Sequence, residues 1–189
     1  LYYIIATMLP IDKIIGNIYP YLGAILLFMA IAIGGSLLIK GATGEVIITE
    51  LTFDNFRNFK SNPTENILFP MLFVVISCGA ISGFHSTQSP LMARCMSNEK
   101  YGKPIFYGAM IAEGVVACIW ATAAMAYFGG PDGLNAAADA GKTPAIIVNE
   151  ICNTWLGKAG AIIAVLGIVV CPITTGDTAF RSLRLILAD

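Results

Sequence analysis

The chain has 189 residues, of which 57% are hydrophobic and only 12% are charged. A soluble domain carries about 25% charged residues, so this composition excludes an ordinary soluble domain and indicates an integral membrane protein. The formal net charge is −1 and the sequence has no basic stripe, which argues against a nucleic-acid partner. No signal peptide is visible and both ends are apolar, so we expect a piece of a larger membrane protein.

The first predicted membrane span covers residues 20–39. Its roughly 20 apolar residues are enough to cross a hydrocarbon layer about 30 Å thick. We expect Asp12 and Lys13 to lie in a short connection before it. Gly34 and Gly35, near its end, are predicted to allow close packing against another helix.

Three further spans follow. Residues 40–66 are polar and predict an external loop, and the second span, at residues 67–93, is interpreted as a broken helix. The third span covers residues 104–128 and opens with a proline, which suits a first helical turn. The fourth covers residues 159–180. The sequence therefore predicts an all-α integral membrane protein with about four spans, all in one transmembrane domain.

Residues 131–157 are predicted to form an external amphipathic helical lid. A short helix is expected at 132–140, and a second begins at Thr143-Pro144, with threonine as cap and proline as first helical residue. One face of the second helix is apolar and consists of Ile147, Val148, Ile151, Cys152 and Trp155. Its other face is polar and consists of Asn149, Glu150 and Asn153. Such a helix lies on a surface rather than spanning the membrane.

Lysine and arginine in short connections predict the orientation. The 94–103 connection carries three basic residues, whereas the 129–157 connection carries Lys142, with Lys158 at its edge. We therefore expect residues 94–103 in the cytoplasm and residues 129–157 outside, in a multi-pass protein of the cytoplasmic membrane.

The stretch from Ser77 to Pro90 changes from apolar residues to glycine, serine, threonine, glutamine and the single histidine of the chain. A break in a membrane helix is tolerated only where protein or a water-filled cavity covers the freed backbone groups. We therefore predict that this stretch lines a solute site. The candidate substrate-binding residues are Gly79, Ser82, Gly83, His85, Ser86, Thr87 and Gln88. For His85, the alternative is a packed histidine bonded to backbone groups freed by the break.

Glu113 is a candidate for proton coupling. It lies nine residues after Pro104, or about 14 Å along a helix, which is close to the middle of a bilayer. Ionisable side chains are rare at that depth and are functional candidates by default. The alternative is a glutamate satisfied by hydrogen bonds to neighbouring helices, since Gly108 and Gly114 indicate tight packing.

A second polar cluster follows Pro172 in the fourth span and consists of Thr174, Thr175, Asp177 and Thr178. Hard cations prefer oxygen ligands, so a sodium site or a proton carrier is predicted here. The alternative for Asp177 is a helical ion pair with Arg181, four residues further on.

No enzyme or metal site is predicted. The five cysteines lie far apart and have no metal-ligand spacing, so we interpret them mainly as small hydrophobic residues. His85 has no obvious nucleophile partner. We expect no cofactor other than a coupling H⁺ or Na⁺.

Three segments together resemble one family. They are ISGFHSTQSPLMARC (81–95), EKYGKPIFYGAMIAEG (99–114) and GDTAFRSLRLILAD (176–189). They are similar to the carbon starvation protein A (CstA) family of membrane transporters, and the likeness covers most of the chain from about residue 67. The resemblance implies a bacterial or archaeal inner-membrane protein linked to peptide uptake during carbon starvation, with relatives that import pyruvate.

The resemblance also implies a LeuT-like fold, with inverted repeats and broken helices. The predicted order agrees: a span outward, a broken span inward, a span outward, a lid and a span inward. Family members are longer than this chain, so the remaining helices, including a second broken helix, are expected to complete the site.

The sequence thus predicts a secondary active transporter and not an enzyme. It would import small peptides by symport with protons or sodium ions. One alternative is a pyruvate/proton symporter of the same family, and another is a membrane sensor or structural subunit without transport. The expected partners are a peptide or pyruvate-like solute, the lipid bilayer and the remaining transporter helices.

Overall fold

The computed structural model describes residues 12–48, 50, 52–53, 58, 64, 67–80, 89–90 and 92–188. Every regular element in these residues is helical. The predicted all-α class is therefore confirmed for the described part of the chain.

Helix α2 (Asp12–Ala42) contains the first predicted span but begins earlier than expected. Asp12 and Lys13 are helical, so the prediction that they form a connection is wrong. Pro20 lies inside the helix instead of starting it. An interior proline is compatible with a membrane helix when neighbouring groups satisfy the freed carbonyl, so proline alone does not fix the boundary. The stretch Pro20–Ala42 is long and apolar enough to cross a membrane.

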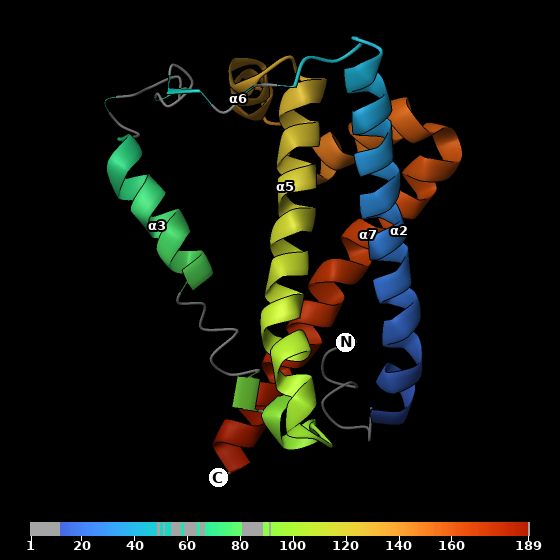
Figure 1. The fold of residues 1–189 in the computed structure, drawn as a ribbon, viewed down its shortest axis with the longest axis vertical. Coiled ribbons are helices and arrows are strands. Elements are labelled where there is room, and N and C mark those ends of the chain that lie inside the picture. Colours follow the sequence, from blue (N-terminus) through green and yellow to red (C-terminus); the bar gives the residue numbers. More distant parts are fainter. Residues whose placement is uncertain are drawn as a thin grey trace.

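Helix α3 (Leu68–Ala80) begins within one residue of the predicted second span. Its apolar part, Leu68–Ser77, is shorter than a full span. Residues 81–88, where the break is predicted, lie outside the described residues, and helical backbone is seen again at residues 92–95. The large apolar side chains of α3, such as Phe69 and Phe73, are exposed, and Figure 1 shows α3 apart from the other long helices.

The third span opens with three successive helix types. A 3₁₀ turn, η2 (Glu99–Tyr101), leads into a π-helix, η3 (Lys103–Gly108), which continues as α5 (Ala109–Tyr127). The proline in the first turn is as predicted, but the wider π-helical turn is not, and the residue pattern gives no physical reason for it. Together the stretch Glu99–Tyr127 is the second that is long and apolar enough to cross a membrane.

The predicted lid region is helical. Helix α6 (Pro131–Asp139) matches the first expected helix, and α7 (Pro144–Ala188) starts at the expected proline. Helix α7 bends at Gly157, whose backbone has φ 71° and ψ −169°. We call residues 144–156 the first arm of α7 and residues 158–188 its second arm. The bend thus falls between the predicted lid and the predicted fourth span.

The described helices alternate in direction, as the sequence predicts. In Figure 1, α2 and α5 run upward, whereas α3 and the second arm of α7 run downward. Among the described residues, the only two stretches that pass as membrane spans by length and apolarity are Pro20–Ala42 and Glu99–Tyr127. The other two spans stay predictions.

The buried core lies where α2, α5 and the first arm of α7 meet. Its buried members come from all three elements: Met29, Ile33, Ala123, Ile151 and Cys152. Aromatic residues of α5 and α7, including Trp120, Tyr127 and Trp155, pack around this cluster. The apolar face predicted for residues 144–156 therefore exists, but it packs on α2 and α5 instead of being left for a membrane surface.

Close helix contacts occur at only some of the predicted glycines. A Cβ at Gly34 would lie 3.5 Å from the Ile119 side chain, so this residue lets α2 approach α5. A Cβ at Gly35 would have no described atom within 4 Å, so the predicted packing role of Gly35 is wrong for the described chain. Gly167 of α7 packs on α2, since a Cβ there would lie 2.9 Å from the Met29 sulfur.

An open apolar groove of about 320 Å³ runs beside the contact between α2 and α7. Tyr21, Phe28 and Leu166 line it together with Ala24, Ile25 and Ile163. The first three side chains are exposed in the described chain, which fits a surface that faces lipid or further helices.

Candidate functional site

The predicted substrate-binding stretch falls almost entirely outside the described residues. This applies to Ser82, Gly83, His85, Ser86, Thr87 and Gln88. Gly79 is described and lies in the last turn of α3, where the predicted break would begin. The roles of all seven residues stay predictions.

Glu113 lies on α5, in the second stretch that is apolar enough to span a membrane. Its side chain is exposed in the described chain. The tight packing expected from Gly108 and Gly114 is absent from the described chain, because a Cβ at Gly114 would have no atom within 4 Å. Proton coupling and the hydrogen-bonded alternative both stay predictions for Glu113.

The second predicted cluster lies on the second arm of α7. The helix continues through Pro172 to Ala188, so Thr174, Thr175, Asp177 and Thr178 are all helical. Thr175 is exposed. The roles of these four residues stay predictions.

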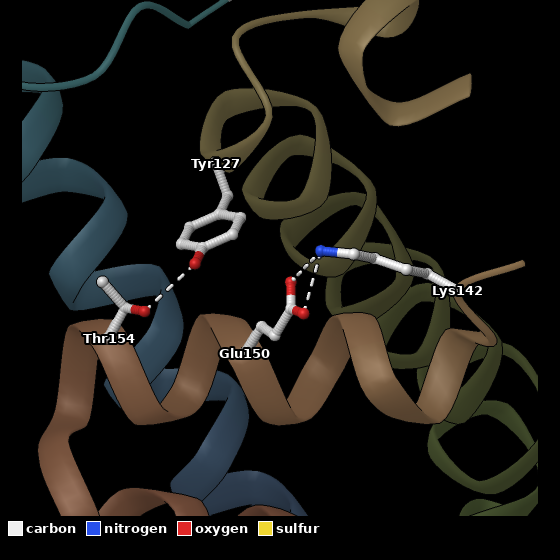
Figure 2. Close-up of polar contacts among 4 residues, drawn as sticks. All are labelled: Tyr127, Lys142, Glu150 and Thr154. Atoms are coloured by element: carbon white, nitrogen blue, oxygen red, sulfur yellow. Dashed lines mark hydrogen bonds and ion pairs between the residues drawn. The ribbon is translucent and has the colours of Figure 1, made fainter. Parts of the chain in front are cut away.

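The best-defined polar constellation lies elsewhere, at the end of α5 that carries Tyr127. We call it the α5–α7 clasp, and its members are Tyr127, Lys142, Glu150 and Thr154 (Figure 2). It joins the last turn of α5 and the α6–α7 connection to the first arm of α7. Figure 2 shows Tyr127 of α5 pointing to Thr154, and Lys142 reaching from the connection before α7 to Glu150 on the first arm.

Lys142 forms the charged half of the clasp. Its Nζ atom donates to both carboxylate oxygens of Glu150, at 2.9 Å and 2.8 Å. The same Nζ lies 5.4 Å from the centroid of the Phe128 ring, within the range of a cation–π contact. Lys142 precedes α7, so the pair fixes the α6–α7 connection against the polar face of the first arm.

Tyr127 forms the neutral half. Its hydroxyl lies 3.1 Å from the Thr154 hydroxyl, and its ring meets Trp155 at a centroid distance of 6.1 Å with an angle of 67°. An edge-on aromatic contact of this kind adds about 0.5–1.5 kcal/mol beyond area burial. Tyr127 therefore joins α5 to the first arm through both a hydrogen bond and ring packing.

Cys152 lies beneath the clasp and is fully buried in the core. Burial raises the pKa of its thiol from 9.0 to about 11. A thiol with such a pKa stays protonated at neutral pH and is a poor nucleophile. Cys95 and Cys118 are exposed in the described chain, whereas Cys152 packs among apolar side chains, as expected of a small hydrophobic residue.

The sequence did not predict the clasp. Glu150 is expected on the polar face of an amphipathic helix, which is correct, but its partner lies eight residues earlier and outside that helix. One signal in the sequence could have indicated this pair: Lys142 lies just before the Thr143-Pro144 helix start, and Glu150 lies after it. Among the described residues, no group of three His, Cys, Asp or Glu side chains is placed to hold a metal ion.

The fold and the apolarity of its helices define a class, that of all-helical proteins with helices able to cross a membrane. The family follows from comparison. The family model described as "Carbon starvation protein CstA" matches residues 1–166. The chain belongs to this family, which confirms the resemblance seen in its sequence.

Relatives of known name support the same assignment. A protein of Haemophilus influenzae named as an uncharacterized membrane protein is 45% identical over 154 residues, which cover 74% of this chain and 40% of the relative. The peptide transporter CstA of Campylobacter jejuni is 45% identical over 51 residues, covering 26% of this chain and 7% of the relative. The pyruvate/proton symporter BtsT of Escherichia coli is 45% identical over 58 residues, covering 30% and 8%.

The chain thus spans 40% of the length of the Haemophilus relative and less than a tenth of the two named transporters. No solved structure matches the chain. Relatives in the family are named as transporters, which agrees with a role in membrane transport at the level of the family.

Proposed function

We propose that this chain forms part of a secondary active transporter that imports small peptides across a bacterial or archaeal cytoplasmic membrane. The observation that carries the proposal is membership of a family whose relatives are named as peptide transporters and as a pyruvate/proton symporter. The two strongly apolar helices support membrane insertion. Import would be driven by a proton or sodium gradient.

The proposed architecture is LeuT-like, with four spans at residues 20–39, 67–93, 104–128 and 159–180 in one transmembrane domain. The alternating direction of the described helices supports this order. Residues 131–157 would form the external lid, so the clasp would hold this lid against the outer end of α5. Further helices of the full-length protein would complete the fold.

The proposed solute site is the broken second span. Gly79 would begin it, and Ser82, Gly83, His85, Ser86, Thr87 and Gln88 would supply hydroxyl, amide and imidazole groups to the solute. Freed backbone groups at a helix break carry partial charges that suit a zwitterionic peptide.

The proposed coupling residues lie on two other helices. Glu113 would take up and release the coupling proton on α5, where a carboxylate in an apolar stretch supports such a role. Thr174, Thr175, Asp177 and Thr178 would bind a coupling cation or form a gate on α7. No other cofactor is required.

A second candidate function is pyruvate/proton symport, which the likeness to the Escherichia coli symporter favours. Uptake of labelled dipeptide and labelled pyruvate by full-length protein in proteoliposomes, with proton and sodium gradients imposed separately, distinguishes the two. Accumulation of dipeptide supports the leading proposal, and accumulation of pyruvate alone supports the second. Accumulation of neither would favour a sensor or structural subunit.

The role of Glu113 is tested in the same vesicles. Glu113→Gln keeps the shape of the side chain but cannot carry a proton, so uptake driven by a proton gradient is expected to fall at least tenfold. Glu99→Gln is the matched control, because Glu99 is an exposed glutamate on η2, just before the apolar part of the same helix. An unchanged pH profile of uptake in Glu113→Gln would remove this residue from the proposal.

A further inference from the structure

Exposed basic residues gather at the end of α5 opposite the clasp. We call Arg94, Lys100 and Lys103, with the aromatic residues Tyr101 and Tyr107, the basic collar. All five side chains are exposed, and the two tyrosines are 55% and 65% exposed. The collar lies on the segment that leads through η2 and η3 into α5.

The backbone of the collar segment is held by local hydrogen bonds. The amide of Met96 donates to the carbonyl of Ala93 at 3.4 Å, and the amide of Tyr101 donates to the carbonyl of Asn98 at 3.1 Å. The Asn98 side chain also accepts from the amide of Lys100 at 3.0 Å. These bonds close two turns of the chain between Arg94 and Lys103.

One side-chain contact joins the two halves of the segment. The methyl group of Met96 lies 3.9 Å from the position that a Cβ would take on Gly102. The three cations of the collar thus belong to one short segment, residues 94–103, directly before the apolar part of the helix.

The collar differs from the other end of the bundle in how its charge is balanced. At the other end, Lys40 pairs with Glu45 and Lys142 pairs with Glu150. Within the described part of the chain, the three cations of the collar form no ion pair, and the one acid in their segment, Glu99, forms none with them. The collar therefore presents unbalanced positive charge, flanked by tyrosines and joined to an apolar helix.

We propose that the basic collar binds the headgroups of anionic phospholipids in the membrane leaflet that meets the Lys103 end of α5. The inference rests on the membrane placement proposed above and not on transport itself. Tyrosine rings collect at the level of lipid headgroups, and lysine and arginine beside a membrane helix are attracted to anionic lipids. The collar places both kinds of side chain where the apolar helix begins.

The geometry favours lipid over a free anion. No buried polar cradle surrounds these cations, since all are exposed, so a small anion would stay largely hydrated. A lipid headgroup is instead held in place by its own acyl chains, which lie along the apolar side chains of η3 and α5. Ile105, between Lys103 and Tyr107, and Met110, just after Tyr107, are exposed apolar residues and suit that contact.

Lipid retention tests the proposal. Full-length protein is reconstituted in vesicles of equal parts phosphatidylglycerol and phosphatidylcholine, extracted in detergent, and the retained lipids are counted by native mass spectrometry. The unmodified protein is expected to retain phosphatidylglycerol in excess. The triple variant Arg94→Gln, Lys100→Gln, Lys103→Gln is expected to lose this preference by about a hundredfold, because each of the three cations near an anionic surface contributes about fivefold.

Lys158→Gln is the matched control. Lys158 is exposed and has no ion pair in the described chain, but residues 143–180 hold no other lysine or arginine and no tyrosine, so its loss is expected to change the preference far less than the triple variant does. If the triple variant does not fold, Lys100→Gln and Lys103→Gln are measured singly, with a loss of about fivefold expected for each. Lys100→Arg and Lys103→Arg should keep the preference.

Three results would overturn the proposal: equal phosphatidylglycerol retention by the triple variant, an equal loss in Lys158→Gln, or displacement of the lipid by inorganic phosphate. The transport proposal fails independently. Loss of uptake with the lipid preference intact counts against transport, whereas uptake without lipid preference counts against the collar.

Discussion

The two ends of the helix that contains α5 differ in burial and in ion pairing. At the Tyr127 end, the first arm of α7 crosses the helix, Ile151 and Cys152 are completely buried, and Lys142 is paired with Glu150. At the Lys103 end, side chains are exposed and the collar cations have no ion pair within the described chain. One helix therefore joins a closed, internally satisfied end to an open end whose charge is left for a partner.

This difference shows where the described chain holds itself together. Packing and hydrogen bonds converge at the Tyr127 end, so substitutions there are expected to change stability. Substitutions at the Lys103 end are expected to change lipid binding and to leave stability in neutral detergent almost unchanged. Single substitutions at the Tyr127 end test this contrast. They remove a buried side chain, the backbone conformation of Gly157 or the Lys142–Glu150 ion pair.

The largest effect is expected from Ile151→Ala. Ile151 has no exposed surface and lies in the core shared by α2, α5 and α7. Truncating a buried isoleucine to alanine costs about 2–5 kcal/mol in the free energy of unfolding. Ile146→Ala is the matched control on the same arm, because Ile146 is 45% exposed, and its cost is expected to be about 0.5 kcal/mol or less. Thermal and denaturant unfolding of full-length protein in detergent measure both. Equal losses would mean that the closed end has no core of its own.

Gly157→Ala is expected to come next. The φ of 71° and ψ of −169° at Gly157 lie in a region open almost only to glycine, so a Cβ costs about 1–3 kcal/mol. A Cβ at Gly157 would have no described atom within 4 Å, so any loss comes from the backbone and not from a clash. Gly35→Ala is the matched control: it also has no described neighbour within 4 Å but lies in a regular helix, where alanine is favoured. A cost in Gly157→Ala no larger than in Gly35→Ala would show that the bend does not depend on this conformation.

The arm and its bend illustrate what sequence patterns can predict. The spacing of Ile147, Ile151 and Trp155 gives the apolar face correctly, and the Thr-Pro start gives the correct first residue of α7. The glycine at 157 ends the arm close to the predicted boundary. These features depend on neighbours along the chain, which a sequence pattern records directly.

A sequence pattern does not show which element packs on an apolar face. The face of the first arm packs on α2 and α5, although its pattern alone is equally typical of a helix on a membrane surface. The Lys142–Glu150 pair was missed for the same reason, because it depends on how the chain turns into α7. For the solute site, the sequence remains the source of the prediction for Ser82 to Gln88, which lie outside the described residues.

The buried thiol of Cys152 predicts a pH dependence of the closed end. Burial raises its pKa from 9.0 to about 11, so the folded state keeps the thiol proton to a higher pH than the unfolded state does. Stability is therefore unaffected below pH 9 and falls as the pH rises from 9 to about 11, by up to about 2 kcal/mol. Cys152→Ala should show a shallower fall over this range, whereas Cys95→Ala, which removes an exposed thiol, should keep the full slope. Equal slopes in the two variants would remove Cys152 as the cause.

The smallest effect is expected from the ion pair of the clasp. The Lys142 and Glu150 side chains are 36% and 33% exposed, so solvent screens the pair and its coupling energy is expected to be about 0.5–1 kcal/mol. A double-mutant cycle with Lys142→Met and Glu150→Gln measures that coupling, and added salt should reduce it. The same cycle with Lys100→Met and Glu99→Gln at the open end is the control and should give almost none, because these two side chains form no ion pair. Equal coupling at both ends would erase the contrast in charge pairing, and the collar cations would then not be free to bind lipid.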